Sequence, residues 1–420
     1  MINPLQINLH ISKSVDWLYN TWKKNKTGVG WSITPDNPRI MQWGGTLDAI
    51  RALVFAGANL NNPMISESVE WLIQTQNDDG GWCSWEIKNS CVDVTCWIVI
   101  TLKMLEMDIY QANINKAIQY IISNQKKDGS WGAYREGESR VYATLLAIWA
   151  LIGIDKSSMM KGINWIIDAR NDDGAWGFKY KDNASNVPMA AIALIVLGKA
   201  SYITSLENCQ KSINYIYSKM HRDYSWEPIH ELYLAYDNEN FEQSPTTCNH
   251  FTGAWAIMAL ISVGENITNI KLMRAISVFL KSQNANGSWC YLKYNKTEYT
   301  WCLANGLWAL IYINQMIQSP ITVHQWAYKQ NDSRRRNIAL LILLCILILE
   351  TLFLSYTFLK DSIDIAKIGI TVQQVIITIK TFWETNQTLI ISSFISLIVT
   401  IIGGILVHRF TIEKKRSHDH

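Results

Sequence analysis

Few residues in this sequence combine a chemically useful side chain with a setting that could support catalysis. Asp93 lies in the stretch CVDVTC at 91–96, where an apolar segment running to Glu106 begins. A carboxyl group surrounded by apolar neighbours can remain protonated and act as a general acid. Aspartate is also a favoured helix cap, so the alternative is that Asp93 only caps a helix beginning at Val94.

Residue types that bind metals occur at two other places. Cys248 and His250 precede the apolar segment 251–263, and Cys302 stands next to the segment 303–313. Zinc binds three or four N, S or O ligands, and this set supplies Cys248, His250 and less directly Cys302. The alternative is that the cysteines are small apolar core residues. The sequence therefore predicts no cofactor, with zinc as the alternative.

Arg140 and several aromatic residues also stand near the starts of apolar segments. A guanidinium group can bind a phosphate bidentately, although Arg140 could instead pair with Glu136 or Glu138. The aromatic candidates for ligand binding are Trp97, Tyr142, Trp255, Tyr299 and Trp301. They suit a cavity for a large apolar or transiently cationic ligand, and the alternative is that they pack between helices.

These candidates belong to a repeating unit. Six acidic or polar turns end in a tryptophan, at Trp31, Trp82, Trp131, Trp176, Trp226 and Trp289, with spacings of 51, 49, 45, 50 and 63 residues. Asp-Gly and Asn-Gly in these turns supply the positive φ that a reversal after a helix requires. Repetition at a nearly fixed period indicates one supersecondary unit used several times.

Each unit predicts two helices. An amphipathic segment precedes the turn, as in 114–125, and a segment that is apolar almost all round follows it, as in 141–154. The first type suits an outer wall and the second a buried position. Six such pairs predict an all-α protein, an α6/α6 toroid over residues 1–330 whose central cavity is lined by the starts of the inner helices.

The repeats resemble those shared by squalene and oxidosqualene cyclases and by protein prenyltransferase β subunits. The resemblance covers residues 1 to about 320. In class II terpene cyclases a central aspartate at the start of an inner helix protonates an alkene or epoxide. The resemblance implies that role for Asp93, with Thr95 matching the threonine that follows the motif. Cys91 and Val94 replace the flanking acidic residues of the family motif.

The same resemblance bears on zinc. Protein prenyltransferases carry zinc ligands at the starts of the fifth and sixth inner helices, as Asp-x-Cys and then His. Cys248 and His250 occupy the first pair of positions, Tyr299 occupies the position of the histidine, and Cys302 lies one turn further on. The resemblance thus implies a zinc site only in part.

The end of the chain has a different composition. Residues 331–420 contain two apolar runs, at about 338–359 and 389–408, each long enough to span a bilayer. Basic residues flank the outer ends of this pair, including Arg334 and Lys414. By the positive-inside rule, we expect a two-pass membrane protein with both ends and the toroid on the cytoplasmic side. Membrane lipid is the expected partner of this hairpin, which could also support a homo-oligomer or a partner protein.

Two functions remain open from the sequence. The first is a membrane-tethered relative of terpene cyclases or prenyltransferases that acts on an isoprenoid or another apolar ligand. The second is a non-catalytic toroid that binds a lipid, peptide or protein and signals through its membrane anchor. Nucleic acid is not expected as a partner, because the net charge is only +3 and no basic stripe is present.

Overall fold

The computed structural model describes residues 3–83, 89–105, 110–202, 206–237, 242–265, 268–292 and 296–318. The chain divides into two units, Met1–Ser333 and Arg334–His420, and the described residues all belong to the first. Among them, no helix combines the length and the apolar character that crossing a membrane requires. The two predicted spans, 338–359 and 389–408, lie outside the described residues.

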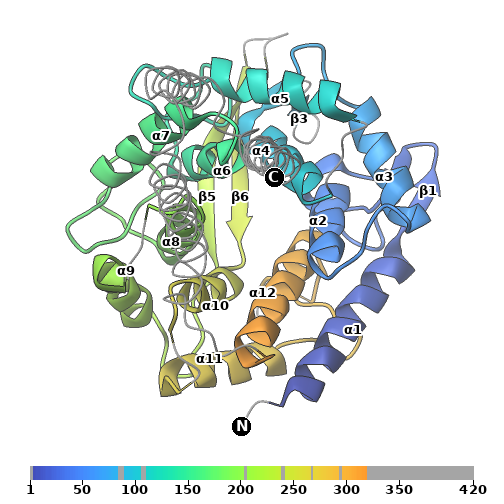
Figure 1. Ribbon diagram of the computed structural model, residues 1–420. Coiled ribbons are helices and arrows are strands. Elements are labelled where there is room, and N and C mark those ends of the chain that lie inside the picture. Colours follow the sequence, from blue (N-terminus) through green and yellow to red (C-terminus); the bar gives the residue numbers. More distant parts are fainter. Residues whose placement is uncertain are drawn as a thin grey trace, which may run out of the picture. The chain divides into compact units, whose positions relative to one another are not determined.

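The first unit is a ring of helical pairs (Figure 1). The outer helices are α1 (Pro4–Thr21), α3 (Pro63–Gln74), α5 (Gln111–Ser123), α7 (Lys156–Asp168), α9 (Leu206–Ser218) and α11 (Ile270–Lys281). The inner helices are α2 (Leu47–Phe55), α4 (Val92–Met104), α6 (Val141–Leu151), α8 (Val187–Lys199), α10 (Thr252–Ser262) and α12 (Thr300–Gln318). Every residue of α6 is buried, as its uniformly apolar sequence predicts. The predicted toroid of paired helices is confirmed for this unit.

The ring closes on itself through both layers. Each inner helix packs against the next, and α12 packs against α2 as well as α1. In the outer layer, the amide of Gln283 donates to the hydroxyl of Ser14 on α1 at 2.8 Å and to the carbonyl of Gly287 at 3.0 Å. The amide of Gln76 likewise donates to the carbonyl of Asn113 on α5 at 2.9 Å. The turn at Gln283 therefore contacts α1, the first outer helix, much as the turn at Gln76 contacts α5, the next outer helix along the chain.

The turn tryptophans fold back onto the helices that precede them. In four of the six, the indole N–H donates to a carbonyl ten residues earlier: Trp82 to Leu72, Trp131 to Ile121, Trp176 to Ile166 and Trp226 to Ile216, at 2.7–2.8 Å. This satisfies one of the carbonyls that a helix C-terminus leaves without a partner. Gly129, at φ +93°, shows why glycine stands in the turn, since a Cβ there would lie 2.6 Å from the carbonyl oxygen of Lys161 on α7.

A long β-hairpin departs from the predicted all-α architecture. Strands β5 (Ile229–Asp237) and β6 (Glu242–His250) pair antiparallel, with Glu231 opposite Cys248. The hairpin lies between Trp226 and α10, and this insertion accounts for the longest repeat spacing, 63 residues against 45–51 elsewhere. It runs across the end of the ring where α4 and α6 begin (Figure 1).

Two short strand pairs and one π-helical segment are also present in the described part. Strands β1 (Lys23–Asn25) and β2 (Gly28–Gly30) pair with each other, as do β3 (Trp82–Cys83) and β4 (Ser90–Cys91). A short π-helical segment, η1 (Gln42–Thr46), leads directly into α2. Gly44 within it has φ +75°, and its backbone N–H is held by the carboxylate of Asp48 at 2.9 Å.

Candidate functional site

A cavity of about 230 Å³ lies where five inner helices begin. Its lining comes from the early turns of α2, α4, α6, α10 and α12, from η1 and β6, and from the loop before η1. Six of the lining residues are aromatic: Trp43, Trp97, Tyr142, Trp255, Tyr299 and Trp301. The structure thus brings together all the aromatic residues predicted to contact a ligand. Their role in binding stays a prediction.

Tryptophans also close the inner end of this cavity. Trp97, Trp149, Trp255 and Trp308 come from four inner helices and pack with ring centroids 5.4–6.4 Å apart. Trp97 and Trp255 also line the cavity, whereas Trp149 and Trp308 lie further along the ring axis among the helices. Packing between helices is therefore observed for all four, while ligand binding by Trp97 and Trp255 stays a prediction. The packed indoles limit how deep a ligand can enter.

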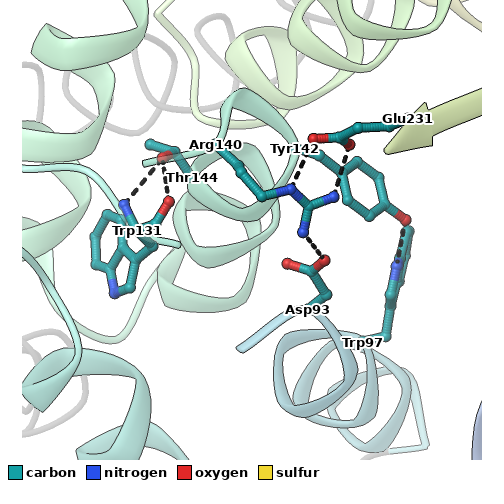
Figure 2. Close-up of polar contacts among 7 residues, drawn as sticks. All are labelled: Asp93, Trp97, Trp131, Arg140, Tyr142, Thr144 and Glu231. Atoms are coloured by element: carbon teal, nitrogen blue, oxygen red, sulfur yellow. Dashed lines mark hydrogen bonds and ion pairs between the residues drawn. The ribbon is translucent and has the colours of Figure 1, made fainter. Parts of the chain in front are cut away.

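Three buried charged residues meet beside the cavity (Figure 2). Arg140 lies just before α6, Asp93 lies in the first turn of α4, and Glu231 lies on β5. The guanidinium of Arg140 donates to Asp93 Oδ2 at 2.7 Å and to both oxygens of Glu231 at 2.6 and 2.7 Å. It also lies 4.0 Å from the ring centroid of Tyr233. This corrects the alternative for Arg140, because its partners are not Glu136 or Glu138.

The triad of Asp93, Arg140 and Glu231 contains two carboxyl groups for one guanidinium. Burial raises the pKa of Glu231, although Arg140 opposes that rise. Of the four carboxyl oxygens, Asp93 Oδ1 is the one without a hydrogen-bond partner among the described residues. A second buried negative charge is costly without a second cation. Because burial raises its pKa, Glu231 is the carboxyl group of the triad whose protonation burial favours.

Asp93 does not cap its helix. Helix α4 begins at Val92 with Cys91 in the capping position, and no side chain caps it. The carboxyl group of Asp93 is bound by Arg140 instead, so the capping alternative is wrong. Asp93 and Arg140 are also absent from the cavity lining, whereas Trp97 and Tyr142 belong to it. Tyr142 accepts a hydrogen bond from Trp97 Nε1 at 2.9 Å.

Thr95 has a structural contact that the sequence interpretation did not foresee. Its hydroxyl accepts from the backbone N–H of Trp82 at 3.0 Å and donates to the carbonyl of Cys91 at 2.8 Å. Thr144 holds the N–H of Trp131 in the same way (Figure 2). In both repeats the tryptophan and the threonine are 13 residues apart. This hydroxyl supports the turn rather than the carboxyl of Asp93.

A second buried ion pair lies in the cavity lining itself. On α2, Arg51 donates to Asp48 at 2.7 Å and approaches the amide oxygen of Asn305 on α12 at 3.4 Å. Its guanidinium lies 4.0 Å from the ring centroid of Trp97 and 5.1 Å from that of Trp308. Sequence reasoning missed Arg51 and Asn305. The available signal was an Asp and an Arg three residues apart in a segment that is otherwise apolar.

The three predicted zinc ligands do not form a metal site. Among the described residues, no group of three or more His, Cys, Asp and Glu side chains is placed to hold a metal ion. Cys248 and His250 line the cavity, while Cys302 is buried in α12 outside that lining. Burial raises the pKa of both thiols well above the ordinary range. Burial also lowers the pKa of His250 to about 3.

Comparison with known proteins identifies one family. The family model described as the squalene-hopene cyclase C-terminal domain matches residues 84–193 and 184–304, which together make up more than half of the chain. A squalene–hopene cyclase from Bradyrhizobium diazoefficiens is 31% identical over 84 residues. That match covers 16% of this chain and 13% of the cyclase, so it spans only a small part of the relative.

Solved structures share the fold at low sequence identity. A variant of the type II terpene cyclase MstE from Scytonema, in complex with its substrate geranylgeranyl dihydroxybenzoate, is 12% identical with a TM-score of 0.53; the match covers 74% of this chain and 99% of that one. A glycoside hydrolase family 76 mannosidase from Bacteroides thetaiotaomicron is 8% identical with a TM-score of 0.52, covering 75% and 99%. Because the same ring carries unrelated activities, these likenesses show the fold alone.

Proposed function

Because this chain belongs to the squalene-hopene cyclase C-terminal domain family, we propose that its helical ring binds an isoprenoid in the cavity at the starts of the inner helices. The observation that carries the proposal is the aromatic lining, to which indole or phenol rings from η1, α4, α6, α10 and the start of α12 contribute. Aromatic faces offer a large apolar surface with low side-chain flexibility. They suit a branched, unsaturated hydrocarbon chain.

The size of the cavity defines how such a ligand would enter. Ligand pockets commonly have volumes of about 300–1,000 Å³, and this one has about 230 Å³. The packed tryptophans close its inner end. One end of an isoprenoid would therefore occupy the cavity, and the rest of the chain would extend out of it.

A binding experiment tests this proposal. Farnesol is titrated into the full-length chain by isothermal titration calorimetry. Ile33 lines the cavity, so Ile33→Trp should fill part of it and weaken binding at least tenfold. Ile154→Trp is the matched control, because Ile154 is exposed outside the cavity, and it should leave binding unchanged. Equal binding by both variants would place the ligand elsewhere.

Acid-initiated cyclisation is the second candidate function. The favouring observation is the triad, in which two buried carboxyl groups share one guanidinium and Asp93 Oδ1 is unpaired. A carboxyl proton would pass to a terminal alkene or an epoxide oxygen, the next double bond would attack the resulting cation, and loss of a proton would end the reaction. The reaction also requires Asp93 to reach the ligand, since its carboxyl is not part of the cavity lining.

Product analysis separates binding from cyclisation. The full-length chain is incubated with geranylgeraniol and with its terminal epoxide, and cyclic products are measured by gas chromatography and mass spectrometry. Asp93→Asn keeps the side-chain shape but removes the acid, so product formation should fall at least 100-fold while farnesol binding persists. If no cyclic product forms in the wild type, the cyclisation proposal is overturned and ligand binding without catalysis remains.

We also propose that residues 331–420 hold the ring at the cytoplasmic face of a membrane, where isoprenoids dissolve. The two apolar runs and their basic flanks support this. Reporter fusions at His420 and within 360–388 should give opposite topology signals. A cytoplasmic signal from 360–388 would contradict the proposed orientation.

A further inference from the structure

The polar groups of the cavity are unbalanced in favour of hydrogen-bond donors. Asp48 is the carboxylate of the cavity lining. Both of its oxygens already accept hydrogen bonds, one from Arg51 and the other from the N–H of Gly44. The amide oxygen of Asn305 faces Arg51. The phenol oxygen of Tyr142 accepts from Trp97. The acceptor oxygens of Asp48, Asn305 and Tyr142 are therefore occupied by the protein itself, whereas Nε2 of His250 has no hydrogen-bond partner among the described residues.

The corresponding donors remain available. Among the described residues, Nε and Nη1 of Arg51 and the amide nitrogen of Asn305 have no hydrogen-bond partner. The O–H of Tyr142 likewise has no acceptor, and burial raises its pKa well above 10, which keeps its proton in place. All three residues are more than nine-tenths buried, and all three line the cavity. Unpaired buried donors favour a ligand that supplies acceptors.

The charge of Arg51 also favours one kind of ligand head group over another. The guanidinium of Arg51 already lies over Trp97 at 4.0 Å, so a permanent cation occupies an aromatic face that a cationic ligand would use. A positively charged head group would meet a like charge in a buried setting. A carboxylate would instead receive charge-assisted hydrogen bonds, which are about twice as strong as neutral ones, and it would share Arg51 with Asp48 as Asp93 and Glu231 share Arg140.

We propose that the ligand carries a carboxylate head group, held by Arg51, Asn305 and Tyr142. Its apolar chain lies against Trp43, Trp255 and Trp301 toward the opening. This inference rests on the proposed function only in placing the ligand in this cavity. It adds the chemistry of the head group, which the aromatic lining does not determine.

Four C10 probes separate the head group from the chain. Geranic acid and geraniol share an isoprenoid chain, while decanoate and decanol share a linear one. Each is titrated into the full-length chain at pH 7.5, with heat and tryptophan fluorescence as readouts. Geranic acid should bind at least tenfold more tightly than geraniol, and decanoate should show the same preference over decanol.

Asn305→Asp is the decisive variant. It keeps the size of the side chain and an oxygen toward Arg51, but replaces the amide donors with a negative charge. Geranic acid should bind at least tenfold more weakly, and geraniol should stay within twofold of the wild type. Asn314→Asp, on the same helix but outside the cavity lining, makes the same charge change and should leave both affinities unchanged.

A second variant covers the case in which Asn305→Asp fails to fold. Tyr142→Phe removes one donor without adding charge, and it should weaken geranic acid several-fold more than geraniol. Equal affinity for acids and alcohols would overturn the head-group inference and leave isoprenoid binding intact. Binding of decanoate without either isoprenoid would support the head group and overturn the isoprenoid ligand. Absence of binding by all four probes would overturn both.

Discussion

Replacing Arg140 by methionine should reveal the buried charge of the triad. Asp93 and Glu231 would lose the guanidinium that lies 2.6–2.7 Å from their oxygens. The wild-type triad already has one carboxyl group more than it has cations, so the variant must neutralise one further carboxyl by protonation. An ordinary carboxyl pKa near 4 makes that protonation cost about 4 kcal/mol at pH 7. Direct removal of one partner from a buried ion pair gives a similar cost, about 3–5 kcal/mol.

The pH dependence gives the prediction its sign. Folded Arg140→Met holds a proton that the unfolded chain releases above pH 4, so its stability is greatest at low pH and falls as pH rises. The loss of folding stability relative to wild type should shrink by about 1.4 kcal/mol for each unit by which pH is lowered, to about 1 kcal/mol at pH 5. At pH 7, about 4 kcal/mol corresponds to a melting temperature lower by on the order of 10 °C.

Circular dichroism melts at pH 5, 6 and 7 and constant ionic strength measure this effect. The control is the triple variant Asp93→Asn, Arg140→Met, Glu231→Gln, which has no carboxyl group left in the triad, so its deficit relative to wild type should not grow as pH rises. An Arg140→Met deficit that is equal at pH 5 and pH 7 would refute the reasoning, because lost packing alone would then explain it.

Three further predictions concern stability. His250 has a pKa of about 3 when folded, so the wild type should lose about 1.4 kcal/mol of folding stability per pH unit as pH falls below 6.5. His250→Gln should remove this loss, which melts between pH 6.5 and 5 measure. Gly129→Ala should destabilise by more than about 1 kcal/mol because of positive φ and contact with α7, whereas Gly198→Ala, in open space within α8, should be neutral or stabilising. Gln283→Ala should lower the melting temperature by breaking the outer closure of the ring. Gln210 on α9 is exposed, so Gln210→Ala should have little effect; equal effects of the two variants would contradict the role of Gln283.

The repeat pattern predicted the ring because local rules act in every unit. The turn glycines and tryptophans specify how each outer helix ends, and the apolar second segments must be buried. Asp93 and Arg140 are 47 residues apart in the sequence, yet both stand at starts of neighbouring inner helices. Placing each residue within its repeat would have brought them together. Pairing Arg140 with sequence neighbours overlooked this.

Other parts of the site could not follow from the pattern. Glu231 and Tyr233 arrive on an inserted hairpin, and a 63-residue spacing indicates an insertion without showing where its strands lie. Thr95 was matched to a family motif, whereas its hydroxyl holds the turn of its own repeat. Cys248, His250 and Cys302 have suitable chemistry for zinc, but their positions within the ring do not converge among the described residues.

Photoaffinity labelling tests the central claim most directly. A farnesyl analogue carrying a diazirine is irradiated with the full-length chain, and the labelled peptides are mapped by mass spectrometry, with excess farnesol as competitor. The account predicts competed labels on cavity residues such as Trp43, Trp255 and Trp301, reduced in Ile33→Trp. Labels confined to the outer helices or to residues 331–420, or labels in the cavity that farnesol does not displace, would contradict it.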